Sequence, residues 1–399
     1  MQLMNYITPL LVLLHLTSVL GVELYGVVAF VTGIILLCFV LMDFGYSLSA
    51  TKKISLKREN RRFIGTLMAS IFIVKAILFI IVIILVLTYA MLTSKYEQYR
   101  LIIILALLPI FFQGMLPVWF FQGIEKMKNI AIITISSKVL FLVLVLIFVK
   151  DESDYWYVPV FNGLGQVFAF ALSIYLVYLC GYSVKIPCKK HILHALAINR
   201  GFFSSRVAVA TYMQAGPVLL GLFSTPVAVA FYSLAEQLYK VMQTAISPIV
   251  QALYPYMSKE KNLRLYYKVA QILVLCVLLG SLLGYMLSPW LVTLVFGSEW
   301  LPSVEILNVF LVAIVVHVLA VLMGYPICSA LNKVQIANQS VLAGAVLYFT
   351  VFFVMHLLDV VNGISVAILM IAAELCVLIY RAIFVIPSAS LMMKEGNDK

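Results

Sequence analysis

Charged residues are scarce in this sequence, and acidic ones are scarcer than basic ones. Of the 399 residues, 16 are Asp or Glu and 27 are Lys or Arg, so that 11% are charged. A soluble domain is typically about 25% charged. With 64% hydrophobic residues and a mean hydropathy of +1.11, the chain is predicted to lie in a membrane, which excludes most soluble enzymes and nucleic-acid-binding proteins.

Metal-binding and catalytic patterns are lacking as well. The six cysteines and five histidines form no C-x-x-C pair and no Cys/His spacing typical of zinc, so neither a disulfide framework nor a metal site is expected. The sequence has no glycine-rich phosphate-binding loop, so ATP is not expected as a direct energy source. Its outer connections are too short to carry catalytic groups. We therefore expect no cofactor and no enzymatic activity.

Long apolar runs are what the sequence does contain. A bilayer core about 30 Å thick needs about 20 apolar residues per helix, and a backbone in hydrocarbon must form helices or a closed barrel. The run Ala76–Leu87 lacks the alternation of a barrel strand, so we predict an all-α integral membrane protein with about 12 transmembrane helices. The expected spans are 2–20, 24–49, 63–91, 100–121, 129–149, 156–180, 201–223, 226–257, 266–295, 302–330, 335–357 and 362–390.

Basic residues concentrate on alternate connections between these spans. With the N-terminus inside, the inner connections hold clusters such as Lys52–Arg62 and Lys185–Arg200, whereas the outer ones hold Lys95, Arg100 and Lys150. This positive-inside pattern predicts an even number of spans and both termini in the cytoplasm. The net charge of +11 therefore suits anionic lipid headgroups on the inner face, and nucleic acid is not an expected partner.

The sequence also contains an internal repeat at a spacing of 207 residues. Three pairs of landmarks share that spacing: Tyr25 with Tyr232, Lys52 with Lys259, and Lys126 with Lys333. We therefore divide the single membrane domain (1–399) into six-helix lobes at 1–190 and 191–399. Six spans per lobe give both lobes the same orientation, which predicts a parallel repeat with a central site between the lobes. The first span is expected to be short at its cytoplasmic end compared with its counterpart near residue 200.

Two segments carry a family resemblance: Met42–Ser55 (MDFGYSLSATKKIS) and Pro117–Asn129 (PVWFFQGIEKMKN). Preceded by Asn5–Leu10 and Val19–Glu23, they resemble the O-antigen flippases (Wzx type). These belong to the polysaccharide-transport branch of the multidrug/oligosaccharidyl-lipid/polysaccharide exporter superfamily.

The resemblance implies a two-lobed, twelve-helix fold of the MATE type. It also implies that the protein moves undecaprenyl-pyrophosphate-linked polysaccharide units from the cytoplasmic to the periplasmic leaflet of the bacterial inner membrane. It would do so by ion-coupled alternating access. The partners implied are the lipid-linked oligosaccharide, the bilayer, a polysaccharide polymerase and a chain-length regulator.

Seven ionisable residues lie within the expected spans, where each costs about 2.5–3.5 kcal/mol on insertion scales and so needs a partner or a polar cavity. They are Lys75, Lys138, Arg206, Glu236, Lys240, Glu374 and Arg381. The basic members outnumber the acidic ones, which favours an anionic substrate. Arg381 lies near the end of its span and is expected to snorkel to the inner surface.

The expected substrate-binding residues are Arg206, Lys240, Glu236, Lys138 and Lys75. Arg206 and Lys240 are expected to contact the pyrophosphate or a phosphosugar, because both side chains bind phosphate well. Glu236 and Lys240 are spaced i,i+4 and so share a helix face; they could also form an ion pair that serves insertion alone. For Lys138 and Lys75, both substrate contact and packing between helices are open.

The expected gate or ion-coupling residues are Asp43, Glu125 and Glu374. Asp43 either breaks its helix together with Gly45 or forms a gating salt bridge with a basic loop. Glu125 lies in an expected tight inner turn, with a gate as the alternative. Glu374 could be a proton or sodium site, or the partner of a Lys on another helix.

Two competing functions are a multidrug/cation antiporter of the same fold and a membrane enzyme such as a glycan polymerase. The antiporter predicts an acidic cavity, whereas the residues within the spans here are mostly basic. The enzyme needs catalytic groups on a sizeable loop, and the sequence offers none.

Overall fold

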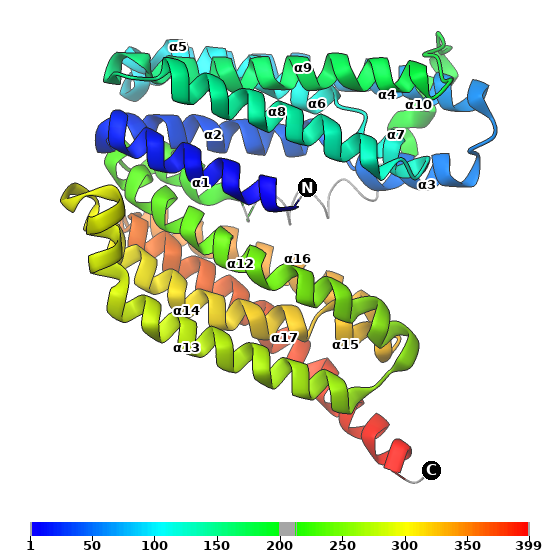
Figure 1. Cartoon of the computed structure of the whole chain (residues 1–399), viewed down its shortest axis with the longest axis vertical. Coiled ribbons are helices and arrows are strands. Elements are labelled where there is room, and N and C mark those ends of the chain that lie inside the picture. Colours follow the sequence, from blue (N-terminus) through cyan, green and yellow to red (C-terminus); the bar gives the residue numbers. More distant parts are fainter. Residues whose placement is uncertain (1, 199–211, 213, 398–399) are drawn as a thin grey trace. The chain divides into compact units, whose positions relative to one another are not determined.

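The computed structural model describes residues 2–198, 212 and 214–397, and within them every regular element is a helix. The chain divides into two compact units, Met1–Val218 and Leu219–Lys399. The helices of both units are labelled in Figure 1. The all-α prediction is confirmed. The predicted lobe boundary at residue 190 stays a prediction, because residues 199–211 are outside the described part.

The first unit contains long apolar helices and several short ones. Its elements are α1 (Gln2–Val19), α2 (Gly21–Asp43), α3 (Tyr46–Leu56), α4 (Arg61–Leu92), η1 (Ser94–Tyr99), α5 (Arg100–Leu105), α6 (Leu107–Met115), α7 (Val118–Gly123), α8 (Met127–Phe148), η2 (Glu152–Trp156), α9 (Tyr157–Leu179) and α10 (Lys189–Ile198). The amphipathic α10 follows the basic connection after α9, and the sequence did not predict it as a helix.

The second unit has fewer and longer helices. They are Gln214–Phe223, with Leu219–Phe223 in this unit, α12 (Pro226–Glu260), α13 (Leu263–Phe296), η3 (Ser298–Trp300), α14 (Ser303–Leu322), α15 (Tyr325–Ala330), α16 (Val334–Leu357) and α17 (Gly363–Asn397). Two of these helices start at an N-cap residue whose side chain accepts a hydrogen bond from a backbone N–H group. Thr225 caps α12, and Asn262 caps α13. Such caps satisfy donors that a helix start leaves unpaired.

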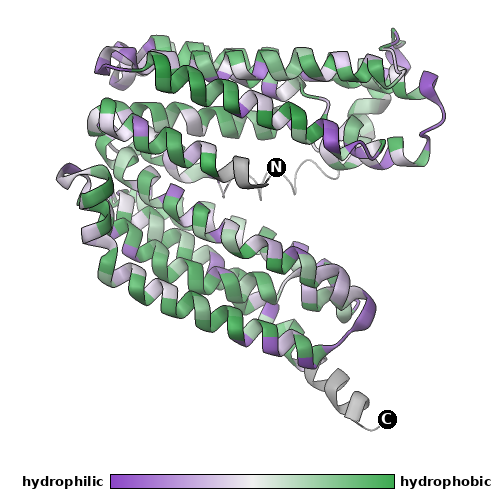
Figure 2. Ribbon diagram, viewed as in Figure 1, coloured by the Kyte–Doolittle hydropathy of each residue, from purple (hydrophilic) through white to green (hydrophobic). Residues whose placement is uncertain are grey.

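Nine segments among the described residues are long and apolar enough to cross a bilayer, and two shorter apolar helices, Ile7–Val19 and Gln214–Phe223, accompany them. Hydrophobic residues cover the length of the helices, and hydrophilic ones gather at their ends (Figure 2). The protein is thus an integral membrane protein of the predicted class. Nine segments do not confirm the predicted count of twelve.

The internal repeat is visible in the backbone. Helices α7 and α15 begin and end 207 residues apart, and so do the starts of α8 and α16. The turns between them match as well, since Glu125 (φ 60°) and Asn332 (φ 56°) occupy equivalent left-handed positions. In each turn the next residue donates its N–H to an equivalent carbonyl, Lys126 to Phe121 and Lys333 to Cys328.

The predicted break near Asp43 is confirmed. Helix α2 ends at Asp43, Phe44 has a φ of 49°, and Gly45 follows with a φ of 81°. Glycine adopts a left-handed conformation without steric cost, so the chain turns here and restarts as α3. The break places the carboxylate of Asp43 at a helix end, where it faces the interior of the first unit.

Candidate functional site

A cavity of about 270 Å³ lies inside the first unit, walled by side chains of α2, α3, α4, α6, α7, α8 and α9. Two predicted substrate-binding residues, Lys75 and Lys138, line it together with Asp43. The apolar lining residues are Phe39, Leu116, Val118, Trp119, Ile133 and Ala169. The other polar lining residues are Ser47, Gln113, Thr134, Ser137 and Gln166. The structure thus brings together three of the residues that the sequence singled out.

Lys75 is almost fully enclosed, with 2% of its surface exposed. Its Nζ donates to the carbonyl of Gly114 over 2.6 Å. Gly114 lies in the last turn of α6, where backbone carbonyls lose their partners within the helix. An ammonium has three donors, so Lys75 can serve this helix end and the cavity together.

Asp43 accepts a hydrogen bond from the Ser47 hydroxyl over 2.9 Å. This bond spans the break between α2 and α3 and orients the carboxylate on the cavity wall. Asp43 therefore lies beside the lysines of the cavity, and its gating role stays a prediction.

Trp119 lines the cavity from α7 and is 1% exposed. Its ring lies 6.4 Å from that of Phe72, measured between centroids. Its indole Nε1 has no hydrogen-bond partner among the described residues. The sequence analysis did not single out this residue, although it lies within the Pro117–Asn129 motif.

The second unit holds a polar stripe on α12. The Nζ of Lys240 lies 2.8 Å from a carboxylate oxygen of Glu236, and their side chains are 32% and 10% exposed. This confirms that the i,i+4 pair shares one face. Substrate contact by either residue stays a prediction.

Glu374 has a partner that the sequence did not identify. Its carboxylate lies 3.1 Å from Nδ1 of His317 on α14, and both side chains are largely buried. The ring of Tyr239 on α12 lies 6.2 Å from the imidazole. The sequence left open a proton or sodium site or a Lys partner on another helix, and the structure places a histidine beside Glu374. The signal that could have found it was a histidine in the middle of an apolar span.

Arg381 does not snorkel to the surface, so that expectation is wrong. It is 5% exposed and donates to the Ser340 hydroxyl over 2.8 Å. It also donates to the carbonyls of Ala320 and Ala337. The guanidinium finds its acceptors inside the helix bundle, which removes any need to reach water.

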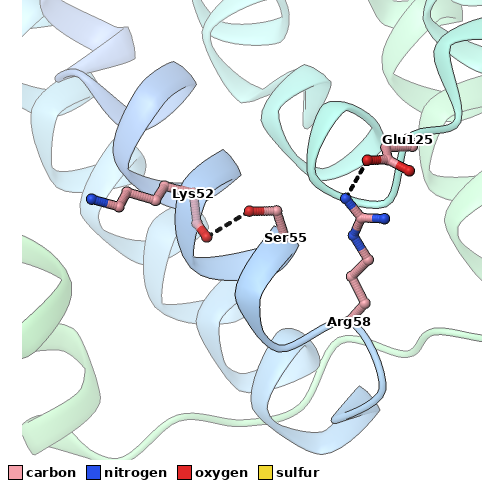
Figure 3. Close-up of polar contacts among 4 residues, drawn as sticks. All are labelled: Lys52, Ser55, Arg58 and Glu125. Carbon is pink, nitrogen blue, oxygen red and sulfur yellow. Dashed lines mark hydrogen bonds and ion pairs between the residues drawn. The ribbon is translucent and has the colours of Figure 1, made fainter.

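Glu125 forms an ion pair at the ends of the helices. A carboxylate oxygen lies 2.5 Å from a guanidinium nitrogen of Arg58 in the connection after α3 (Figure 3). The hydrogen bond from Arg58 lowers the pKa of Glu125, and the same bond raises the pKa of Arg58. Lys52, whose carbonyl accepts from Ser55, points away from the pair (Figure 3). The expected tight turn is confirmed, and the gate stays a prediction.

The remaining predicted site residue, Arg206, lies outside the described residues. Within the described part of the chain, no group of three or more His, Cys, Asp or Glu side chains could hold a metal ion. The arrangement therefore offers ammonium groups, amides, hydroxyls and one carboxylate inside a bundle of apolar helices. Such a set suits binding and passage of a polar headgroup.

Comparison with known proteins decides the family. The model of the family described as "Polysaccharide biosynthesis protein" matches residues 1–261. The chain belongs to this family. The match confirms the resemblance drawn from Met42–Ser55 and Pro117–Asn129, both of which lie inside it.

A relative of this polysaccharide biosynthesis protein in Shigella dysenteriae, named as a candidate O-antigen transporter, is 27% identical over 88% of this chain and 89% of its own. Among solved structures, the lipid II flippase MurJ in an inward closed conformation superposes with a TM-score of 0.77 at 12% identity, covering 97% of this chain and 88% of MurJ. A multidrug resistance MATE transporter of the MOP superfamily gives 0.70 at 12% identity, covering 96% of each chain. These structures show that the fold is the one shared by MurJ and MATE transporters.

Proposed function

We propose that this protein is a flippase for lipid-linked polysaccharide units of the O-antigen type. The observation that carries the proposal is the cavity of the first unit, whose largely apolar wall includes the ammonium-bearing side chains of Lys75 and Lys138 on helices of a MurJ-like fold. Buried ammonium groups are costly in a bilayer unless they serve a polar or anionic group. The transporter names of the relatives and the family description support transport of a glycan rather than an enzymatic step.

The proposed direction is from the cytoplasmic to the periplasmic leaflet of the bacterial inner membrane, by alternating access. The undecaprenyl tail stays in the bilayer while the headgroup crosses a polar path. Lys240 and Arg206 contact the pyrophosphate, and Glu236 holds Lys240 in place through their ion pair. On the outer side of the membrane, a polymerase and a chain-length regulator receive the translocated polysaccharide unit.

The proposed coupling site is the pair of Glu374 and His317. A carboxylate and an imidazole in hydrogen-bond distance can exchange and store a proton. The pair lies between α14 and α17, so a change in its protonation alters a contact between two packed helices. Asp43 and Glu125 act as gates at helix ends in the first unit.

Complementation tests the function. The chain and its Lys75→Ala, Lys138→Ala and Lys240→Ala variants are expressed in a strain that lacks its O-unit flippase, and surface lipopolysaccharide ladders are blotted at equal protein level. We expect ladders from the wild type and their loss in Lys240→Ala. Ladders in all three variants would keep the function and remove the basic residues from it. Arg264→Ala, an exposed change on α13, is the control.

The coupling site is tested in the same strain. Glu374→Gln and His317→Asn are each expected to weaken the ladder, and the double variant is expected to be no weaker than either single variant, because residues that act as one unit give non-additive effects. A ladder of wild-type strength from Glu374→Gln would remove the pair from coupling.

Drug export is the competing function, since a MATE transporter shares the fold. If the wild type gives no ladder with a matching O-unit but confers resistance to cationic drugs, the flippase proposal fails and the antiporter replaces it.

A further inference from the structure

The cavity of the first unit has a mixed chemistry that differs from a site for phosphate alone. Lys75 and Lys138 supply ammonium donors, Gln113 and Gln166 supply amides that both donate and accept, and Asp43 supplies a carboxylate acceptor. The carboxylate in the wall partly offsets the attraction of the two lysines for a pyrophosphate, whose non-bridging oxygens share its negative charge. Hydroxyl groups, in contrast, can donate to Asp43 and accept from the lysines at the same time.

The indole donor of Trp119 lacks an acceptor. The indole N–H can only donate, its residue is 1% exposed, and Nε1 has no hydrogen-bond partner in the described part of the chain. Buried polar groups in native structures are almost always paired. Trp119 lines the cavity, but its Nε1 is closed off by neighbouring protein atoms, so a ligand would lie beside this residue without bonding to the indole nitrogen.

The size of the cavity limits the ligand. Pockets for drug-sized molecules have volumes of about 300–1,000 Å³, and this cavity has about 270 Å³. It is therefore large enough for one sugar ring, and the rest of a repeat unit would lie outside it through its open side.

We propose that this cavity is a subsite for a single sugar residue of the transported glycan, with Asp43 accepting from its hydroxyls and Lys138 and Gln166 donating to its oxygens. The proposal rests on the proposed function and deepens it, because it separates sugar recognition in the first unit from pyrophosphate contacts by Lys240 in the second. In this proposal, the subsite is also where the protein distinguishes one sugar from another.

Tryptophan emission of the full-length protein in lipid nanodiscs tests the subsite. Glucose, N-acetylglucosamine and glucuronate are titrated separately, and inorganic pyrophosphate is titrated as the competing probe. We expect a saturable change with at least one sugar, which pyrophosphate neither produces nor displaces. Trp119→Phe should remove this signal, whereas Trp290→Phe, a change on the exposed face of α13, should retain it.

Two milder variants keep the test decisive if Trp119→Phe does not fold. Asp43→Asn keeps an oxygen that can accept from Ser47, and Gln166→Leu keeps the side-chain size. Both should show the native emission spectrum and weaken sugar binding by about tenfold or more. Unchanged binding in both variants would overturn the subsite, as would a signal from pyrophosphate alone or the absence of any saturable signal.

The two proposals fail separately. If the wild type restores ladders but no sugar alters its emission, the subsite is wrong and the flippase function stands. If sugars alter the emission of Trp119 but no matching O-unit is transported, the flippase function is wrong and the cavity remains a sugar site.

Discussion

Each unit contains a buried cationic side chain that donates to a backbone carbonyl at a helix end. The two residues are not equivalent positions of the repeat. Lys75 on α4 donates to the carbonyl of Gly114 at the end of α6, and Arg381 on α17 donates to that of Ala320 at the end of α14. Both acceptors come just before a break in a membrane helix, where unpaired backbone carbonyls cost several kcal/mol each in hydrocarbon. A charge at membrane depth can thus stabilise a helix end as well as bind substrate.

Arg381 provides the test of this role, because its guanidinium donates to two backbone carbonyls as well as to the Ser340 hydroxyl. Arg381→Met should lower the free energy of unfolding by about 2–3 kcal/mol or more, since each hydrogen bond to a charged group is worth about 1.5–3 kcal/mol. The measurement is thermal unfolding of the purified protein in detergent. Arg264→Met, on an exposed face of α13, is the matched control, and an equal midpoint for both variants would contradict the role.

The contact of a side chain could be predicted from the sequence when the residue and its partner lie on the same helix. The spacing of Glu236 and Lys240 indicated a shared face because helix geometry fixes where an i+4 neighbour points. Glu374 and His317 lie 57 residues apart on two helices, so their contact depends on how α14 packs against α17. The hydrogen-bond acceptors of Arg381 could not be predicted for the same reason, since they lie on other helices. The prediction that Arg381 snorkels was wrong because it considered α17 without its neighbours.

At the scale of elements, the turn before α8 depends on a close approach of two short helices. A Cβ on Gly123 would lie 2.6 Å from side-chain atoms of Ile54, so α7 packs against α3 without room for a methyl group. Glu125 then takes a left-handed φ of 60°, and its side chain reaches Arg58. The glycine therefore sets the position of the ion pair.

Substitution of glycines separates packing from helix propensity. Gly123→Ala should lower the unfolding midpoint, because inserting atoms into a packed site costs about 1–3 kcal/mol. Gly280→Ala on α13 meets nothing within 4 Å and should raise the midpoint slightly, since alanine favours a helix by about 0.5–1 kcal/mol over glycine. Opposite signs in thermal unfolding are the expected outcome, and a neutral Gly123→Ala would show that α3 and α7 do not pack closely.

The pair of Arg58 and Glu125 gives a pH prediction. Because Arg58 lowers the pKa of Glu125 below its ordinary value of 4.5, the stabilisation is fully present above that value and is lost only as the pH falls through the lower folded pKa. Between pH 5 and 8 the pair should therefore stay charged, and complementation should not vary with pH through this contact.

Charge exchange tests whether the pair acts as a gate. Arg58→Glu and Glu125→Arg should each weaken the lipopolysaccharide ladder, and the double variant should restore it, because the exposed pair is re-formed with opposite signs. The side chains of Arg58 and Glu125 are 39% and 65% exposed, so a merely structural surface pair would leave all three ladders at wild-type strength. A double variant as weak as the singles would show that position, rather than pairing, matters.

Elements were predictable where the bilayer dictates their length. The spans expected at 63–91 and 335–357 match α4 and α16 within two residues at each end, because apolar length alone sets a spanning helix. The ten residues of α10 escaped prediction, since they are too short and too polar for that criterion. The count of twelve spans is not reached by that criterion among the described residues, because Ile7–Val19 and Gln214–Phe223 are shorter apolar helices and α12, which carries Glu236 and Lys240, is not among the nine.

At the scale of the whole molecule, the orientation across the bilayer remains to be tested, and α9 offers the sharpest comparison. One end follows the acidic connection of Asp151 and Glu152, and the other leads to the basic segment around Cys188. A single membrane crossing, Glu152–Leu179, separates the two. They must lie on opposite sides, and the positive-inside rule places Cys188 in the cytoplasm.

Labelling of single cysteines decides the side. In a variant that retains Cys188 alone, a membrane-impermeant maleimide should label intact spheroplasts weakly and permeabilised ones strongly, because the thiol is exposed but internal. Ser153→Cys in a cysteine-free background, at an exposed site in η2, should be labelled equally in both. Labelling of Cys188 in intact spheroplasts would show that the protein has the opposite orientation in the membrane. It would place the lysine-rich face on the outside and reverse the proposed direction of transport.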